Sequence, residues 1–576
     1  MKRNSIKLVG QSGSGLLSTG EILANALKNI GFYINTDREF PSLIKGGHSS
    51  FQVDFSTEPI RSSTSYADIL IGMDEHGLKN YVDKTRKGGI VIHGFERHEK
   101  VMKLKKSVEE RELKVAYLPA REIAESFGGN VLMTNMILLG LLWKILDFPL
   151  EPLEEEVKKR FASKPALLEI DLKCLHKAYE SEDTPDLKIE VNKEKPETIL
   201  INGNYAIGIG GIQAGVRTFY AYPMSPASSI LSYLAATYHE SGMLVKQAED
   251  EITAVQMTMG AMYAGSRAFT ATSGGGFDLM TESVSAAGIM ECPLVVVIAQ
   301  RPGPGTGLPT WTCQGDLNLA IHAGHGEYGK AVLACSDPYS AYEQIQHALN
   351  IAEKYQVPVI LLSEKEIAES MQTVPRFKED QIPIERGLTQ GKDLEELKST
   401  DRYAITDSGV SKRWIPGSTK TYFYSNSDEH WEDGVLTEEA DKAGQMYEKR
   451  LKKMETMLSE FPDPIVYGEE DADISFVGWG SSKNVMLDVI EYLKSEGVKV
   501  NYLHYDYLWP LKTEKFVEFF DKNKRVCLIE GNHGGQLGQL LEDKTNKLFA
   551  SKLLKFDGRA FFFDEVLEFI KANHDK

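Results

Sequence analysis

The sequence has few cysteines, and none of them stands in a pair that could bind a metal. Among 576 residues there are five thiols, spread along the chain at Cys174, Cys292, Cys313, Cys335 and Cys527. Zinc sites and iron–sulfur clusters need closely spaced thiolates, as in Cys-x-x-Cys. The sequence therefore encodes neither centre locally, and we expect the cysteines to be small buried side chains.

The chain also lacks a long apolar run and an excess of basic residues. The stretch MILLGLLW at 136–143 is followed by Lys144, and a membrane-spanning helix needs about 20 apolar residues. The opening residues, MKRNSIKLVGQSG, do not resemble a signal peptide. A net charge of −18 argues against nucleic acid or anionic membrane as a partner. We expect a cytoplasmic protein that binds neither.

Strand patterns alternate with amphipathic helical stretches along most of the chain, which is typical of α/β domains with parallel sheets. We predict three α/β domains, at 1–185, 199–375 and 464–576. The charged segment 186–198 has few large apolar residues and is interpreted as a linker. Residues 376–463 are interpreted as an irregular acidic connector that contains a strongly charged helix.

Two glycine-rich segments could suggest nucleotide binding, but neither matches a nucleotide-binding motif. They are GQSGSG at 10–15 and GIGGIQAG at 208–215. Neither has the glycine spacing G-x-G-x-x-G with an acidic residue placed to hold a ribose. A tight turn and close helix packing are the favoured interpretations.

Three further stretches carry chemistry. YPMSPASS at 222–229 places serine hydroxyls at a helix start, where they could bind an anion, although an ordinary N-cap is favoured by spacing alone. Arg301 ends a buried strand, where its forked donors suit a carboxylate, although a lone arginine more often pairs with a surface acid. VKQAEDEITAV at 245–255 has three consecutive acids, which favour a helix start or a buried catalytic carboxylate.

In this order, YPMSPASS, VKQAEDEITAV, TATSGGGFDLM and AQRPGPGTGLPTWTCQGD resemble the 2-oxoacid:ferredoxin oxidoreductases. The resemblance is to the alpha subunit that carries the pyrimidine-binding domain for thiamine diphosphate. GQSGSGLLSTG, FPSLIKGGHSSFQV and NMILLGLL resemble the family's gamma domain, fused here at the N-terminus. VGWGSSKN, LWPL, EGNHGGQLGQLL and FDGRAF resemble its transketolase C-terminal-like domain. The resemblance therefore implies a function for all three predicted α/β domains.

The resemblance implies a role for one acid of the triplet. In the family a glutamate hydrogen-bonds a nitrogen of the aminopyrimidine ring and stabilises the imino tautomer, which takes the proton from the thiazolium carbon. By motif position, nine residues before Gly260, this glutamate is Glu251. Glu249 and Asp250 are then expected only to cap the helix and to place negative charge at its first turn.

The resemblance also implies neighbours for the cofactor and the substrate. Tyr222, Pro223 and Met224 are expected to bind the cofactor with Glu251. Ser225 replaces the threonine of the family's YPITP but keeps the hydroxyl that meets the substrate carboxylate. Arg301 matches the arginine that pairs with the same carboxylate, so Glu251, Arg301 and Ser225 are the expected catalytic residues.

Trp311 marks a departure from the family members that act on 2-oxoglutarate-like substrates. Those members often have a basic residue after GLPT, where this chain has Trp311. An indole cannot pair with a second carboxylate. We therefore hypothesise a monocarboxylate substrate, with Trp311 among the substrate-binding residues.

The resemblance further implies partners. The chain has no Gly-Asp-Gly motif followed by asparagine for Mg²⁺ and diphosphate, and no cysteine set for a cluster. A separate beta subunit is expected to supply Mg²⁺ and a [4Fe-4S] cluster in an αβ or (αβ)2 assembly, with coenzyme A as co-substrate and ferredoxin as electron acceptor. The loop Lys45–His48 could approach coenzyme A, although a simple turn is favoured.

Two rival functions remain open at this point. The chain could be the half-subunit of another thiamine diphosphate enzyme, such as a transketolase or a 2-oxoacid dehydrogenase. It could also be a non-catalytic structural subunit of the same fold. The N-terminal domain argues against the first alternative, and the presence of Glu251, Ser225 and Arg301 argues against the second.

Overall fold

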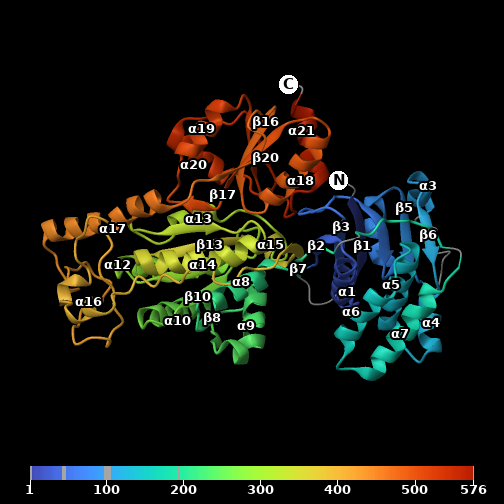
Figure 1. Ribbon diagram of the computed structural model, residues 1–576, viewed down its shortest axis with the longest axis horizontal. Coiled ribbons are helices and arrows are strands. Elements are labelled where there is room, and N and C mark those ends of the chain that lie inside the picture. Colours follow the sequence, from blue (N-terminus) through green and yellow to red (C-terminus); the bar gives the residue numbers. More distant parts are fainter. Residues whose placement is uncertain (1–2, 42–46, 96–104, 183, 193–194, 575–576) are drawn as a thin grey trace. The chain divides into compact units, whose positions relative to one another are not determined.

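The computed structural model describes residues 3–41, 47–95, 105–182, 184–192 and 195–574 (Figure 1). The chain forms two compact units. The first comprises Met1–Ile201, Ser370–Arg376 and Phe561–Lys576, and the second comprises Asn202–Glu369 and Phe377–Ala560. Each unit is therefore assembled from segments that are distant in the sequence.

The first unit is built on one mixed sheet in the order β6-β5-β4-β1-β3-β2-β14-β7. Its strands are β1 (Arg3–Gln11), β2 (Tyr33–Glu39), β3 (His48–Ser56), β4 (Ala67–Gly72), β5 (Thr85–His93), β6 (Lys114–Tyr117), β7 (Thr198–Ile201) and β14 (Gln372–Pro375). Its helices include α1 (Leu16–Asn29), α2 (Glu75–Tyr81), α3 (Lys105–Glu110), α4 (Ala120–Ser126), α5 (Thr134–Ile145), α6 (Glu151–Phe161), α7 (Pro165–Tyr179) and α21 (Phe563–His574). β1 runs parallel to β4 and antiparallel to β3.

Successive side chains of a strand point to opposite sides of the sheet, so both faces of this sheet can carry apolar residues. Helices cover both faces. Ile69 and Ile71 of β4 pack in one apolar core together with residues of α1 and α5. Leu70, between them, packs in a second core with Leu78 of α2. The continuous apolar run of α5 follows from this position, since nearly every side chain from Met136 to Ile145 is buried.

Segments from far along the chain complete the first unit. β7 and β14 pair with each other, and β14 also pairs with β2. The amide of Phe563 donates to the carbonyl of Ser63, and Asp564 accepts from the amide of Ser65 at 2.8 Å. The compact units do not follow the domain limits expected from the sequence. Those limits stay predictions: 1–185, 186–198, 199–375, 376–463 and 464–576.

The second unit contains a sheet in the order β18-β12-β13-β11-β10-β8-β9. Its strands are β8 (Thr218–Ala221), β9 (Leu244–Gln247), β10 (Ala268–Thr272), β11 (Leu294–Gln300), β12 (Ala331–Ala334), β13 (Pro358–Glu364) and β18 (Tyr507–Trp509). The helices beside it include α8 (Gly203–Gln213), α9 (Ser228–Ser241), α10 (Glu251–Tyr263), α11 (Gly274–Phe277), α12 (Thr281–Ile289), α13 (Leu317–His322), α14 (Pro338–Tyr355) and α15 (Lys365–Glu369). All neighbouring strands are parallel except β18, which is antiparallel to β12.

A smaller sheet in the same unit has the order β15-β17-β16-β19-β20. Its strands are β15 (Ile465–Gly468), β16 (Ile474–Trp479), β17 (Val500–Tyr505), β19 (Val526–Glu530) and β20 (Ser551–Leu554), with helices α18 (Ser482–Ser495), α19 (Glu514–Lys522) and α20 (Gln536–Thr545). Val477 and Leu503 share one buried core with Leu294 and Ile298 of the larger sheet. The predicted α/β fold class is confirmed by three α/β sheets. The expected parallel sheet is wrong for the first unit, where β3 pairs antiparallel with β1 and β2.

No single helix in the described ranges is long and apolar enough to cross a membrane. One pair, Ala120–Ser126 with Val131–Ile145, passes a test of length and composition only when taken together across a bend of 118°. The same ranges contain no group of three or more His, Cys, Asp or Glu side chains that could hold a metal ion.

The segment 376–463 contains the short helix α16 (Lys392–Glu395) and the long helix α17 (Ala440–Glu460). Buried ion pairs hold this segment to the larger sheet of the second unit. Glu353 of α14 is fully buried and accepts from Arg267, Arg386 and Arg413 at 2.7–2.8 Å. Arg267 immediately precedes β10, so this cluster ties the segment to the start of that strand.

A second buried carboxylate, Glu291, is surrounded in the same way. Lys449 and Lys453 of α17 each lie 2.5 Å from one of its oxygens. These ammonium groups, together with Arg402, hold the pKa of Glu291 far below its usual range, although burial opposes them. Glu291 stands shortly before β11, so α17 is fixed at the start of that strand.

Replacing Glu353 with glutamine is expected to destabilise the second unit by about 3–5 kcal/mol, because three arginines would then surround a neutral group. Urea unfolding, followed by fluorescence, measures the change, and limited proteolysis should cut 376–463 faster. Glu455→Gln on α17, which removes the exposed pair with Lys452, is the control and should change stability by about 0.5 kcal/mol or less. Equal effects of the two substitutions would contradict the importance of the buried cluster.

Candidate active site

The residues singled out from the sequence follow the carboxyl ends of four neighbouring parallel strands. β9, β8, β10 and β11 are adjacent in this order in the larger sheet of the second unit. β8 leads to Tyr222–Ser225, β9 to Glu251, β10 to Gly274–Gly276, and β11 to Arg301. From β8 the chain continues first to β9 on one side and then to β10 on the other. Open α/β sheets bind ligands in the crevice at such a switch point.

The acidic triplet divides as the local geometry of a helix start requires. Asp250 is the N-cap of α10, and its side chain accepts from the amide of Thr253 at 2.7 Å. This bond lowers the pKa of the Asp250 carboxyl. Glu249 is exposed, whereas Glu251 is only 4% exposed. Helical spacing places Ala254, Val255 and Thr258 with Glu251 on the buried face of α10.

The Glu251 side chain lies against α11 (Gly274–Phe277), the single helical turn that follows β10 and is called the glycine turn below. A Cβ atom on Gly276 would stand 2.7 Å from Glu251 Oε1 and 2.1 Å from Thr272 Oγ1, so no larger residue fits there. Among the described residues, Glu251 Oε1 is buried without a hydrogen-bond partner. A buried carboxylate oxygen is costly unless something satisfies it. This oxygen is therefore a candidate for contact with a ligand.

Ser225 and Arg301 are brought together across the crevice. Arg301 Nη1 donates to the carbonyl oxygen of Ser225 at 2.9 Å, which leaves the exposed Ser225 hydroxyl on the same short turn. Partial burial lowers the pKa of Arg301, and the nearby carboxylate of Asp316 opposes this effect. The guanidinium remains a cation and is held at the carboxyl end of β11.

Tyr222, Pro223 and Met224 precede Ser225 on the turn after β8. Tyr222 is 38% exposed, and Met224 Sδ lies 2.7 Å from the hydroxyl of Ser273 in the glycine turn. The favoured N-cap role of the serines is wrong, because α9 begins after Ala227 and no side-chain cap bond is present at this described helix start. The peptide bond between Ser225 and Pro226 is cis and turns the chain before α9.

Trp311 lies in the loop that follows Arg301, and its ring is covered by a cation. The guanidinium carbon of Arg559 lies 3.4 Å from the ring centroid, and Arg559 Nη1 donates to the carbonyl of Asp557. The amide of Thr312 donates to the carbonyl of Gly558 at 3.1 Å. The Trp311 loop is thus joined to the loop 557–559 beside the smaller sheet.

Asp316 was not predicted from the sequence as a site residue, although it ends the stretch AQRPGPGTGLPTWTCQGD. Its carboxylate lies on the other side of the glycine turn, where a Cβ on Gly274 would stand 2.6 Å from Asp316 Oδ2. Burial raises the pKa of Asp316 to about 6, with Asp278 adding to the effect and Arg301 opposing it. In the sequence, Asp316 stands four residues before Ala320, a buried apolar residue of the following helix. This pattern indicates only a helix N-cap.

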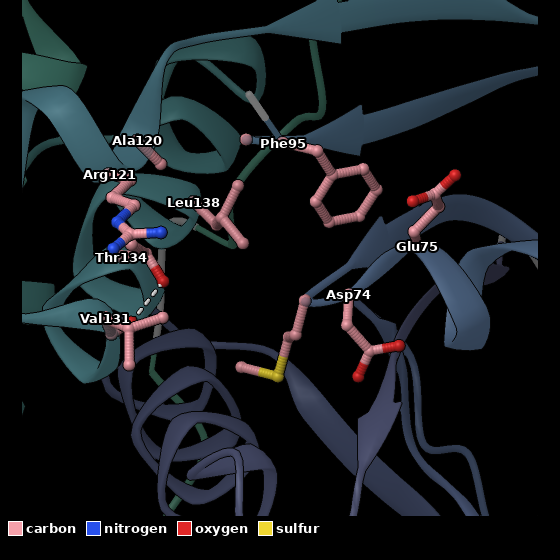
Figure 2. A pocket seen from close by; sticks show the side chains of 10 residues that line it. Asp74, Glu75, Phe95, Ala120, Arg121, Val131, Thr134 and Leu138 are labelled. Carbon is pink, nitrogen blue, oxygen red and sulfur yellow. Dashed lines mark hydrogen bonds between the residues drawn. The ribbon is translucent and has the colours of Figure 1, made fainter. Parts of the chain in front are cut away.

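The first unit has a cavity of its own, of about 460 Å³. Figure 2 shows Asp74 and Glu75 on one side of it, Arg121 and Val131 on the other, and Phe95 between them. Asp74 caps α2 through the amide of Gly77. Of the loop Lys45–His48, for which a simple turn is the favoured interpretation, Lys45 and Gly46 lie outside the described residues. His48 begins β3, where its ring centroid lies 4.1 Å from that of His76.

Three family models match successive parts of the chain. "Pyruvate ferredoxin/flavodoxin oxidoreductase" matches residues 5–181, "Pyruvate flavodoxin/ferredoxin oxidoreductase, thiamine diP-bdg" matches 209–449, and "Pyruvate:ferredoxin oxidoreductase core domain II" matches 472–560. The second match includes the candidate site and most of the segment 376–463. The third ends where the chain passes into the first unit.

Full-length relatives are similar along nearly the whole chain. The 2-oxoacid:ferredoxin oxidoreductase subunit alpha of Saccharolobus solfataricus is 30% identical over 99% of this chain and 98% of its own length. Subunit alpha of 2-oxoacid:ferredoxin oxidoreductase 1 from Aeropyrum pernix is 32% identical over 100% and 99%. The structure of 2-oxoglutarate:ferredoxin oxidoreductase from Magnetococcus marinus, with 2-oxoglutarate, coenzyme A and succinyl-CoA bound, matches all of both chains with a TM-score of 0.91 and 30% identity.

Proposed function

The chain belongs to the alpha subunits of the 2-oxoacid:ferredoxin oxidoreductases, and we propose that with a beta subunit it converts a 2-oxoacid and coenzyme A to an acyl-coenzyme A. Carbon dioxide is released, and the electrons pass through the beta subunit to ferredoxin. The observation that carries this proposal is the buried Glu251, whose Oε1 has no partner in the described part of the chain and faces a glycine turn at the switch point of the sheet. The match along the whole chain favours this function over a transketolase half-subunit.

The residues around Glu251 fit thiamine diphosphate. Glu251 Oε1 would hydrogen-bond a ring nitrogen of the aminopyrimidine, and Gly276 leaves room for that contact because any side chain there would strike the carboxylate. Tyr222, Pro223 and Met224 would line the same ring from the turn after β8. When bound, thiamine diphosphate supplies a nucleophilic carbon and an electron sink for decarboxylation. Glu251 then holds the ring in the tautomer that accepts the proton of that carbon.

The substrate carboxylate would be held by Ser225 and Arg301. The guanidinium offers forked donors to a carboxylate, and its bond to the Ser225 carbonyl keeps it beside the Ser225 hydroxyl. Holding the carboxylate fixes the bond that breaks when carbon dioxide leaves. The presence of both groups at the same edge of the sheet as Glu251 supports catalysis over a purely structural role for the chain.

The beta subunit is proposed to bring Mg²⁺, the diphosphate site and a [4Fe-4S] cluster, in an αβ or (αβ)2 assembly. The sequence carries neither the Gly-Asp-Gly motif nor a cysteine set for a cluster, which supports this division. For coenzyme A we propose the cavity of the first unit as part of the site. Phe95 offers a ring surface to an adenine there, and Arg121 offers a cation to a phosphate.

Glu251→Gln in the complex with the beta subunit should keep thiamine diphosphate affinity within a few-fold while turnover falls about 10²–10⁴-fold, because an amide cannot take part in the proton transfer. Calorimetric titration with the cofactor and ferredoxin reduction measure the two effects. Glu249→Gln, on the exposed neighbour, is the matched control and should behave as wild type. Undiminished turnover of Glu251→Gln would reject the catalytic role of Glu251.

The chain without its beta subunit should be inactive.

Gly276→Ala should weaken cofactor binding by about 1–3 kcal/mol, because the new methyl group would displace Glu251 or Thr272. Gly275→Ala is the matched control one residue away, since its Cβ would meet only the carbonyl of Gly305, at 3.5 Å. Titration with thiamine diphosphate distinguishes the two variants of the complex. Similar affinities of the two variants for thiamine diphosphate would show that the Glu251 carboxylate does not contact the cofactor.

A monocarboxylic 2-oxoacid is proposed as the substrate. No basic side chain follows GLPT, and the Arg559 guanidinium beside Trp311 is engaged with the indole and the Asp557 carbonyl. A second carboxylate placed against Trp311 would lose water without gaining a charged partner from the indole itself. We expect kcat/KM for pyruvate or a branched 2-oxoacid to exceed that for 2-oxoglutarate about ten-fold or more. A strong preference for 2-oxoglutarate would reject the substrate class but not the reaction.

A further inference from the structure

Ser273 stands where a serine ordinarily caps a helix, but its hydroxyl is used elsewhere. It is the N-cap residue of α11, and no side-chain cap bond is present at this described helix start. Ser273 is fully buried, so its hydroxyl needs a partner inside the protein. That partner is the thioether of Met224, whose Sδ accepts from Ser273 Oγ at 2.7 Å. The residue before the glycine turn thus donates to the turn that follows β8.

The order of the sheet explains why these two turns meet. β8 and β10 are neighbouring parallel strands, in which Phe269 pairs with Phe219. Their carboxyl ends therefore lie at the same edge of the sheet, and the residues that follow are close in space. Met224 follows shortly after β8, which ends at Ala221, and Ser273 directly follows β10. The hydrogen bond between them joins two of the turns that form the candidate site.

The sulfur of Met224 is also a near neighbour of the Glu251 carboxylate. Thr272 Oγ1 lies 3.8 Å from Met224 Sδ. A Cβ on Gly276 would stand 2.1 Å from the same hydroxyl oxygen and 2.7 Å from Glu251 Oε1. The fully buried Thr272 hydroxyl therefore lies between the sulfur and the carboxylate. Met224 and Glu251 come together here although they follow different strands.

A methionine needs such a contact if it is to present a fixed surface to a ligand. Its side chain is unbranched, has three rotatable bonds and adapts readily to its surroundings. Met224 is only partly buried, so packing alone leaves the end of the side chain room to move. A thioether is a weak hydrogen-bond acceptor, but the donation from the fixed, buried Ser273 holds the sulfur in one place.

We propose that Ser273 is a positioning residue that holds the Met224 side chain in place as a wall of the thiamine diphosphate site. This inference rests on the proposed function, in which Met224 lines the aminopyrimidine ring. When the wall is already ordered, binding of the cofactor does not have to restrict the methionine. The contribution of Ser273 is therefore expected in cofactor affinity and not in the chemical step.

A different route would run through the glycine turn itself. Loss of the Ser273 hydroxyl would then shift the turn and, with it, Glu251. That route does not involve the sulfur, so Ser273→Ala would lower the affinity whether or not a methionine is present at position 224. A role through Met224 makes the effect of Ser273→Ala depend on the sulfur. A double-mutant cycle distinguishes the two routes.

The test is the affinity of the assembled complex for thiamine diphosphate, measured by calorimetric titration in Ser273→Ala, Met224→Leu and the double variant. We expect Ser273→Ala to raise the Kd about three- to ten-fold, as for one lost hydrogen bond, while kcat at saturating cofactor changes less than about two-fold. In the Met224→Leu background, which keeps a similar side-chain volume, Ser273→Ala should change the Kd less than about two-fold. An unchanged Kd in Ser273→Ala, or an equal rise in both backgrounds, would overturn the proposal.

Ser285→Ala is the matched control. Ser285 is also buried, but its hydroxyl donates to the carbonyl of Glu282 at 2.8 Å within α12, so the Kd should stay as in wild type. A rise equal to that of Ser273→Ala would show that the loss of any buried hydroxyl is enough, and would overturn the proposal. Should Ser273→Ala not assemble, Ser273→Cys, which replaces the hydroxyl with a weaker donor, provides the same comparison in the two backgrounds.

Cofactor titration of the wild type separates this inference from the proposed function. If the wild-type complex bound no thiamine diphosphate, the proposed function itself would fail. If the wild type bound the cofactor and Glu251→Gln lost turnover, but Ser273→Ala bound the cofactor as tightly as wild type, only the role of Ser273 would fail.

Discussion

The candidate site depends on how the amino-terminal ends of two strands are fixed. Arg267, just before β10, is bound to the buried Glu353, and Glu291, shortly before β11, is bound to two lysines of α17. Both clusters tie the segment 376–463 to the sheet. Since strands are stiff, fixing where β10 and β11 begin also fixes where they end, and the glycine turn and Arg301 follow at those ends. A segment that looks irregular in sequence thus supports the site from the far edge of the sheet.

Carboxylates are buried in two distinct ways in the second unit. Glu353 and Glu291 are surrounded by cations that compensate for the loss of water, so their roles are structural. Glu251 and Asp316 each keep one buried oxygen that has no partner in the described part of the chain. An unsatisfied carboxylate destabilises the fold unless a ligand or a nearby charge compensates for it. The contrast within one sheet is the physical reason why Glu251, and not Glu353 or Glu291, is proposed as the carboxylate that meets a ligand.

Local rules could predict part of this arrangement from the sequence. The alternation of strands and helices predicts the α/β sheets. The distinction between Asp250 and Glu251 comes from motif position within the family resemblance, and the helix start with its N-cap at Asp250 agrees with it. The additions of β7, β14 and α21 to the first unit could not be predicted, because they depend on pairings such as Phe563 with Ser63 that no local pattern encodes. Asp316 was missed for a related reason: its sequence context is that of an N-cap, and only tertiary packing against Gly274 shows that the carboxylate is not used as one.

The spacing of the glycines explains how two buried acids of different origin can pack against one short helix. Gly274 and Gly276 each contact one carboxylate, whereas Gly275 between them lies open. This follows from the helical conformation of α11, since residues two positions apart in a helix lie about 200° apart around its axis. Any side chain at the outer positions would push its acid away, so glycine is required there by space and not by backbone angle. Glu251 arrives from the loop after β9 and Asp316 from the loop after β11, and the turn after β10 keeps them apart. The two carboxylates are thus held on different faces of the same short helix and do not meet each other.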